Sequence, residues 1–263
     1  MYLDFSSGDL NLVWRPELVL RLSGTASNIC NSDGENILFT NGMQIFGKHG
    51  ERIADTIAYG GFMTLYWSLY VADPPYGILG MQRHSSTLIL PIPDHEGTYL
   101  TLYHTAEFSE EMTFDVSQFL QAKVEINNDS VYSLIYQDST FGPYLRWYHD
   151  DILATRHANG RDWWIVLFEN SSLRYHSYIL HPEGITLQTT GELQTPLRYG
   201  LGQAVFSPQG RYIAKVDATT FDEGQFIALL EFDRCDGTIH EKATLHTTAG
   251  TFSGAAFSPS ERF

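Results

Sequence analysis

Apolar and polar positions alternate in short runs along most of this chain, and tight-turn sequences separate these runs. An alternation with a period of two places successive side chains on opposite faces of a β-strand. The runs 204–206 and 212–216 flank the turn sequence Ser-Pro-Gln-Gly, so together they predict a β-hairpin. No apolar run approaches the roughly 18 residues that cross a bilayer. We therefore expect a chain built from β-strands, with no membrane insertion.

The same turn recurs five times at blade-sized intervals of roughly 50 to 65 residues. Each turn opens with proline or a short polar residue and then reaches a position where φ must be positive, which favours glycine. That position holds Gly34, Gly97, Gly160 and Gly210 in the first four copies, and Glu261 in the fifth. The recurrence predicts five first hairpins of a repeated unit.

A second hairpin follows the first in most copies, as in 44–53, 178–187 and 230–239. Two successive hairpins make a four-stranded antiparallel meander of roughly 45 residues, which is the size of a β-propeller blade. One blade cannot bury both of its faces, so neighbouring blades must cover it. The predicted fold class is an all-β β-propeller with about four and a half blades and an incomplete ring.

The repeat divides the single predicted domain, 1–263, into blades. These are an outer half-blade at 1–22, four blades at 23–80, 81–147, 148–198 and 199–250, and the start of a further blade at 251–263. Tyr2 to Val13 resembles only a second hairpin, and Ser253 to Phe257 reads as an inner strand. We expect either a small ring closed by these two halves or an open arc with exposed strand edges, as in a piece of a longer propeller.

Two regions depart from the simple repeat. Residues 108–122 could place Phe108, Met112 and Phe119 on one helix face, but 113–116 alternates as a strand does, and the repeat requires a third strand there. Two insertions, 60–80 and 127–148, are expected to be loops or extended blade edges. Their aromatic residues are candidates for an exposed binding surface: Trp67, Tyr70, Tyr76, Trp147 and Tyr148.

Composition narrows the partners and the chemistry. Charged residues make up 18% of the chain and aromatic residues 14%, a balance unlike that of disordered proteins. A net charge of −15 disfavours nucleic acid and anionic membrane surfaces as partners. Two cysteines are too few for a disulfide framework or a zinc site. We expect Cys30 to be free and buried in an inner strand, and Cys235 to lie at a distant outer turn.

Four segments, 32–42, 157–164, 206–210 and 231–237, resemble the secreted WD40-like β-propellers that accompany type IX secretion sorting domains. The resemblance covers nearly the whole chain and is most specific in His-Ala-Asn-Gly-Arg-Asp-Trp and Phe-Asp-Arg-Cys-Asp-Gly. It implies an extracellular or cell-surface protein whose full length carries a signal peptide and often a sorting domain. It implies no particular catalytic activity. Residues 1–9 lack the basic and apolar regions of a signal peptide.

Loops that enter the innermost strands of a propeller face the mouth of its central channel, where propellers usually bind ligands. The candidate ligand-binding residues on these loops are Gln82, Arg83, His84, His149, Asp150, Asp151, Arg198, Tyr199 and Gln203. The alternative is that they are solvated loop residues and channel-lining groups bonded to water. We expect no metal and no cofactor, and we assign no catalytic residue.

Two other polar groups are interpreted as turn structure. His157 occupies the repeat position that holds Ser207 and Ser258, so it is expected to cap its turn. Asn31 begins an acidic run with the spacing of a calcium loop, but the glycine comes two places too early and Gly42 stands where such a loop needs glutamate.

Two functions remain from the sequence. The first is a non-catalytic surface module that binds protein or glycan. The second is a lactonase-like or other hydrolase with its site at the mouth of the channel, which would need a metal cage or an activated nucleophile. No Gly-x-Ser-x-Gly or His-Glu-x-x-His motif occurs.

Overall fold

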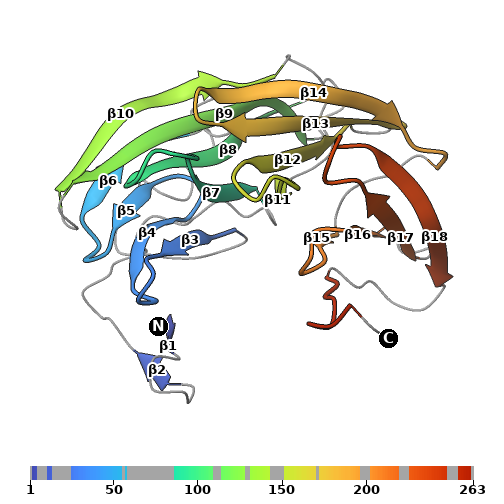
Figure 1. Cartoon of the computed structure of the whole chain (residues 1–263), viewed down its shortest axis with the longest axis horizontal. Coiled ribbons are helices and arrows are strands. Elements are labelled where there is room, and N and C mark those ends of the chain that lie inside the picture. Colours follow the sequence, from blue (N-terminus) through green and yellow to red (C-terminus); the bar gives the residue numbers. More distant parts are fainter. Residues whose placement is uncertain are drawn as a thin grey trace.

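A computed structural model shows the chain as strands and turns (Figure 1). It describes residues 2–4, 11–13, 25–54, 57, 86–108, 114–127, 131–142, 151–169, 172–195, 202–218, 225–247 and 254–261. Within these residues no helix has the length and apolar character needed to cross a membrane.

The strands form four antiparallel sheets, each of four strands in chain order. Blade 1 contains β3 (Ser27–Cys30), β4 (Asn36–Thr40), β5 (Ile45–Gly47) and β6 (Arg52–Ala54). Blade 2 contains β7 (Thr87–Pro91), β8 (Thr98–Phe108), β9 (Phe114–Asn127) and β10 (Val131–Thr140). Blade 3 contains β11 (Leu153–Arg156), β12 (Trp163–Phe168), β13 (Arg174–His181) and β14 (Gly184–Glu192). Blade 4 contains β15 (Ala204–Phe206), β16 (Tyr212–Ala218), β17 (Gln225–Phe232) and β18 (Ile239–Thr247). A separate hairpin pairs β1 (Tyr2–Asp4) with β2 (Asn11–Val13).

The blades stand side by side in an arc, with β3, β7, β11 and β15 on its inner side and β10, β14 and β18 on its outer side (Figure 1). Blades 1 and 4 lie at the two ends of the arc, and the described blades do not close into a ring (Figure 1). The predicted propeller of four-stranded antiparallel blades is therefore confirmed. Of the two expected shapes, a small closed ring and an open arc, the described blades form the open arc.

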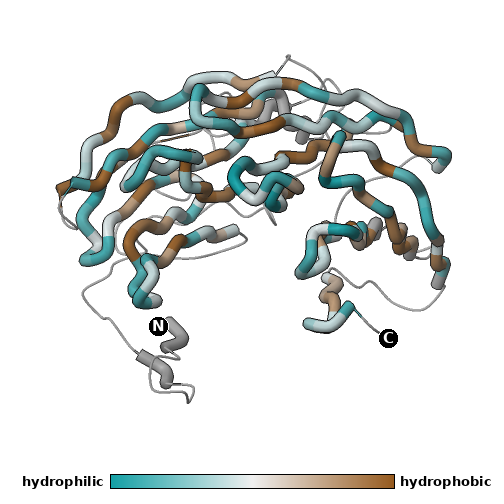
Figure 2. Tube along the Cα trace, in the orientation of Figure 1, coloured by the Kyte–Doolittle hydropathy of each residue, from teal (hydrophilic) through white to brown (hydrophobic). Residues whose placement is uncertain are grey.

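Three hydrophobic clusters hold the arc together, and each lies between two neighbouring blades. Leu38 of blade 1 packs with Tyr103 of blade 2, Leu100 of blade 2 packs in the cluster with Ile165 of blade 3, and Trp164 of blade 3 shares a cluster with Phe232. Figure 2 shows the alternation that permits this packing, because apolar and polar positions follow one another along the strands. Stability thus depends on contacts between adjacent blades.

The predicted first-hairpin turns are present in all five copies. The key position has φ of 81° at Gly34, 70° at Gly97, 75° at Gly160 and 70° at Gly210. Glu261, which takes the same position in the fifth copy, has φ of 53°. Its Oε1 accepts a hydrogen bond of 2.7 Å from the backbone N–H of Gln209, so the fifth turn is tied to the fourth.

The strand prediction for 113–116 is confirmed, because β8 ends at Phe108 and β9 begins at Phe114. Most of the described part of the 127–148 insertion belongs to β10, so this part is an extended blade edge. The insertion at 60–80 lies outside the described residues. The five candidate aromatic residues, Trp67, Tyr70, Tyr76, Trp147 and Tyr148, lie outside them as well.

Two sequence expectations are wrong. Cys30 is free but exposed, because it is the last residue of β3 and lies beside the turn, opposite Asn36, after a register shift. Cys235 is free and exposed in the β17–β18 turn, as expected from its position. Residues 254–257 are irregular rather than a strand, since no neighbouring strand among the described residues pairs with them.

The outermost strand pair of every blade contains a register shift. The shifts lie in β5–β6, β9–β10, β13–β14 and β17–β18. Such β-bulges bend the strand and increase its local twist.

Candidate functional site

Of the nine candidate residues at the channel mouth, the structure describes Asp151 and Gln203. The other seven, Gln82, Arg83, His84, His149, Asp150, Arg198 and Tyr199, lie outside the described residues. Both described residues lie near the start of an innermost strand, Asp151 before β11 and Gln203 before β15.

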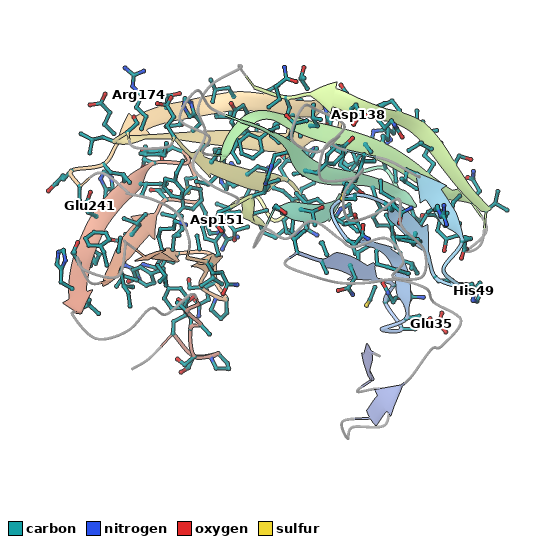
Figure 3. All side chains as sticks on the ribbon, turned by 180° about the vertical axis from the view of Figure 1, so that it is seen from behind. Glu35, His49, Asp138, Asp151, Arg174 and Glu241 are labelled. Atoms are coloured by element: carbon teal, nitrogen blue, oxygen red, sulfur yellow. The ribbon has the colours of Figure 1, made fainter. Side chains whose placement is uncertain are left out.

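Asp151 is a buried link between blades 3 and 4. Its Oδ2 forms an ion pair with Nζ of Lys215 in β16, and the two side chains are 1% and 0% exposed. Its Oδ1 accepts a hydrogen bond of 3.2 Å from the N–H of Ala204, while Lys215 also donates to the carbonyl of Gly202 at 3.0 Å. Both carboxylate oxygens are occupied within the protein. Figure 3 shows Asp151 on the inner side of the blades.

A pocket lies at the other end of the inner strands, between the β7–β8 turn of blade 2 and the β11–β12 turn of blade 3. Its volume is about 480 Å³. It is lined by Pro91, Ile92, Pro93, Asp94, His95, Glu96, Gly97, Thr98, Tyr99, Arg156 and Arg161. Arg156 ends β11 and Asp151 precedes its start, so this pocket and the expected channel mouth lie at opposite ends of the strand.

Arg161 bridges the two walls of the pocket. Its Nη1 lies 3.2 Å from Oδ2 of Asp94 on blade 2. Its Nε and Nη2 donate to the two carboxylate oxygens of Asp162, at 2.7 and 3.1 Å. The hydrogen bonds from Arg161 are the main reason why the pKa of Asp162 is lowered from its ordinary value, against the opposing effect of burial. The charge of Arg161 is therefore committed to two carboxylates.

Arg156 is held in a different way. Its guanidinium lies 3.8 Å from the centre of the Trp163 ring, in a cation–π contact, and Nη1 donates to the carbonyl of Arg161 at 2.7 Å. Within the described part of the chain, no carboxylate is paired with it. Burial lowers the pKa of Arg156 from its ordinary value, as expected for a cation without an anionic partner. The pocket thus contains an oriented cation with donors to spare.

The blade 2 wall is formed by a tight turn. Asp94 has φ of 58°, a conformation uncommon outside glycine, and its neighbour His95 donates from its N–H to the carbonyl of Ile92. There is no room for a side chain at Gly97, because a Cβ there would lie 2.7 Å from the carbonyl oxygen of Ile126. The hydrogen bond to Ile92 and the close approach of Gly97 to Ile126 therefore hold the backbone of this wall in place.

The turn interpretation of His157 and Asn31 is confirmed. Nδ1 of His157 accepts from the N–H of Asn159 at 3.0 Å, and its ring stacks on Trp164 with 5.1 Å between centroids. Oδ1 of Asn31 accepts from the N–H groups of Asp33 and Glu35 at 3.1 and 2.9 Å. No group of three or more potential metal-binding side chains occurs among the described residues.

The pocket was not predicted from the sequence, where His157 was interpreted only as a turn residue. The repeat register contained the necessary signal, since equivalent turns of neighbouring blades lie side by side. Asp94 precedes Gly97 in one turn and Arg161 follows Gly160 in the next, so a pair between them could have been anticipated.

No protein-family model matches the sequence, and no curated protein matches it. Among solved structures, a "putative 6-phosphogluconolactonase" from Bacteroides fragilis NCTC 9343 is similar, with a TM-score of 0.42 and 10% identity over 89% of this chain and 74% of that one. One of the same description from Bacteroides uniformis ATCC 8492 has a TM-score of 0.38 and 12% identity, over 84% and 71%. A functionally unknown protein from Desulfotomaculum acetoxidans DSM 771 has a TM-score of 0.38 and 13% identity, over 90% and 58%. Similarity this low transfers no residue or activity to this chain.

Proposed function

We propose that this chain is a β-propeller binding module, and that the pocket between blades 2 and 3 binds an acidic sugar of a glycan. The observation that carries the proposal is the guanidinium of Arg156, which lines the pocket, lies over the ring of Trp163 and pairs with no carboxylate of the described residues. A planar guanidinium matches the geometry of a carboxylate and can bind it through two hydrogen bonds.

The rest of the pocket suits a sugar ring. Its volume of about 480 Å³ falls among those of ordinary small-molecule sites. Pro91, Pro93 and Tyr99 supply apolar surface for the C–H face of a ring, while His95 and Glu96 supply groups that hydrogen-bond hydroxyls. The combination of one uncommitted cation with polar and apolar walls favours a uronic acid over a neutral sugar.

The place of action is proposed from the sequence. The resemblance to secreted WD40-like propellers of the type IX secretion group supports an extracellular or cell-surface location, where acidic polysaccharides are available as partners. The net charge of −15 means that binding relies on local contacts rather than on long-range attraction of the anion.

The hydrolase alternative placed its site at the channel mouth. Asp151, the acidic candidate described there, has its oxygens occupied by Lys215 and by the N–H of Ala204. A carboxylate that is buried and paired with a cation does not contact a molecule in the channel mouth, so the described geometry supports the binding pocket better than a site there.

Isothermal titration with a galacturonic acid trisaccharide and with the neutral galactose trisaccharide of the same linkage tests the proposal. We expect binding of the acidic sugar only. Arg156→Met keeps the apolar stem and removes the charge, so the affinity should fall at least about tenfold, the value of one charge-assisted hydrogen bond.

Arg174→Met is the matched control. Arg174 begins β13, is paired only loosely with Glu192 at 3.6 Å, and lies at the outer edge of the blades (Figure 3). This variant should bind the acidic trisaccharide as the parent does. Equal affinity for the acidic and neutral sugars, no binding of either, or an unchanged affinity in Arg156→Met would each overturn the proposal.

A further inference from the structure

A second polar cluster lies on blade 3, at the ends of the strands away from the pocket. Glu169 directly follows β12, His176 lies in β13, and Thr190 lies opposite His176 in β14. Nε2 of His176 is 2.8 Å from Oε1 of Glu169, and Nδ1 is 3.1 Å from Oγ1 of Thr190. One imidazole therefore connects a carboxylate to a hydroxyl.

The hydrogen bonds assign the protons. A carboxylate can only accept, so Nε2 of His176 carries the proton that it donates to Glu169. In the neutral ring Nδ1 then carries a lone pair, and it accepts a hydrogen bond from the hydroxyl of Thr190. This is the arrangement of an activated nucleophile, in which a hydroxyl contacts a base and the base is oriented by an acid group.

Burial is graded along the cluster. The side chains of Glu169 and His176 are 14% and 8% exposed, whereas Thr190 is an exposed residue. Partial removal from water strengthens the bond between carboxylate and imidazole. The hydroxyl at the other end remains within reach of a molecule from solution.

The three groups are held by regular structure. His176 is paired with Leu167 on one side and with Thr190 on the other, and the N–H of Glu169 donates to the carbonyl of Arg174 at 3.0 Å. Groups on strands keep their geometry better than groups on loops. The base and the nucleophile therefore need no rearrangement to meet.

Tyr178 adds a potential donor next to the base. Its ring centroid is 6.5 Å from that of His176, and its buried hydroxyl has no hydrogen-bond partner among the described residues. Burial, with a contribution from the charge of Glu169, raises the pKa of Tyr178 to about 12. The hydroxyl thus stays protonated and able to donate.

We infer that Thr190, His176 and Glu169 form a hydrolytic site for small carboxylic esters or lactones, with Thr190 as the nucleophile. This site is separate from the glycan pocket and does not depend on it. Oγ1 of Thr190 attacks the carbonyl carbon while Nδ1 of His176 takes its proton. The ester C–O bond then breaks, and the departing alkoxide receives that proton. Water hydrolyses the acyl-threonine by the same route, releasing the carboxylic acid and restoring the hydroxyl.

Labelling with a fluorophosphonate, followed by peptide mass spectrometry, and hydrolysis of p-nitrophenyl acetate test the inference. We expect one adduct at Thr190 and an ester hydrolysis rate above that of buffer. Thr190→Val keeps the β-branched shape and removes the hydroxyl, so both signals should fall at least tenfold. Thr190→Ser should retain them.

Thr186→Val is the control, because Thr186 is an exposed threonine of the same strand whose hydroxyl, among the described residues, accepts a hydrogen bond from Gln188 alone. It should leave labelling and hydrolysis unchanged. Glu169→Gln should lower kcat with little change in KM, because the amide orients the imidazole of His176 less firmly than the carboxylate does. An adduct elsewhere, no adduct at all, or a full hydrolysis rate in Thr190→Val would overturn the inference.

Discussion

The indole Nε1 of Trp164 in blade 3 donates a hydrogen bond of 2.8 Å to the carbonyl oxygen of Arg234 in the β17–β18 turn of blade 4. The guanidinium of Arg234 returns the contact, donating to the carbonyls of Arg156 at 2.6 Å and His157 at 3.2 Å. A third bond, of 3.0 Å, reaches the carbonyl of Gln209. One turn of blade 4 is thereby fastened to the β11–β12 turn that carries one wall of the pocket.

Gly237 tests how closely this turn must approach Trp164. A Cβ at Gly237 would lie 2.7 Å from the Trp164 ring, and φ there is 77°. We expect Gly237→Ala to lower the free energy of unfolding by about 2–4 kcal/mol, through backbone strain together with overpacking. Urea denaturation measures the change.

Gly160→Ala separates the two causes. Gly160 has a similar φ of 75°, but no atom lies within 4 Å of the position of its Cβ. Gly160→Ala should therefore lower the free energy of unfolding only through backbone strain, by about 1 kcal/mol. Equal losses in the two variants would show that contact with Trp164 is not the constraint.

The Asp151–Lys215 pair predicts strong coupling between blades 3 and 4. Lys215→Met leaves a buried carboxylate without its cation, which should lower the free energy of unfolding by about 3–5 kcal/mol. Adding Asp151→Asn removes the stranded charge, so the double variant should be more stable than Lys215→Met alone. Urea midpoints of the parent, both single variants and the double variant complete the cycle. Additive losses would contradict the pairing.

Asp162 predicts a pH dependence of stability. Its folded-state pKa is lowered, chiefly by the hydrogen bonds of Arg161, so the unfolded chain binds a proton more readily. The stabilisation is present above the ordinary aspartate pKa of about 3.9 and is lost as the pH falls through the lower folded-state value. Asp162→Asn should therefore cost about 1–3 kcal/mol at pH 7, and progressively less below about pH 4. Urea unfolding across that pH range measures both curves, and a constant difference between them would refute the assignment.

The repeat was readable from the sequence because its geometry is local. A turn that needs positive φ selects glycine, so Gly34 and Gly210 marked the register even where the strands differ. Glu261 shows how far this logic extends, since its place in the repeat indicated the conformation although its residue type did not.

The candidate site was less predictable because it depends on neighbours in space. Asp151 was identified as polar and near the channel, but its partner Lys215 lies in another blade and left no pattern in the sequence. Glu169 follows β12, His176 lies in β13 and Thr190 lies in β14, so the three residues form no spaced motif. Cys30 was expected to be buried from its strand alone, whereas its place at the strand end decides its exposure.

The register shifts of the outermost strands bear on how the protein behaves at high concentration. A flat outer strand such as β10 or β18, with exposed Val131 or Leu245, would be a template on which another chain could add a strand. A bulge in each outermost pair distorts that template, because the backbone donors and acceptors no longer follow an even ladder. The bulges therefore reduce the tendency of the outer strands to pair with another chain. Removing a bulge should promote fibre growth before it destabilises the blade itself.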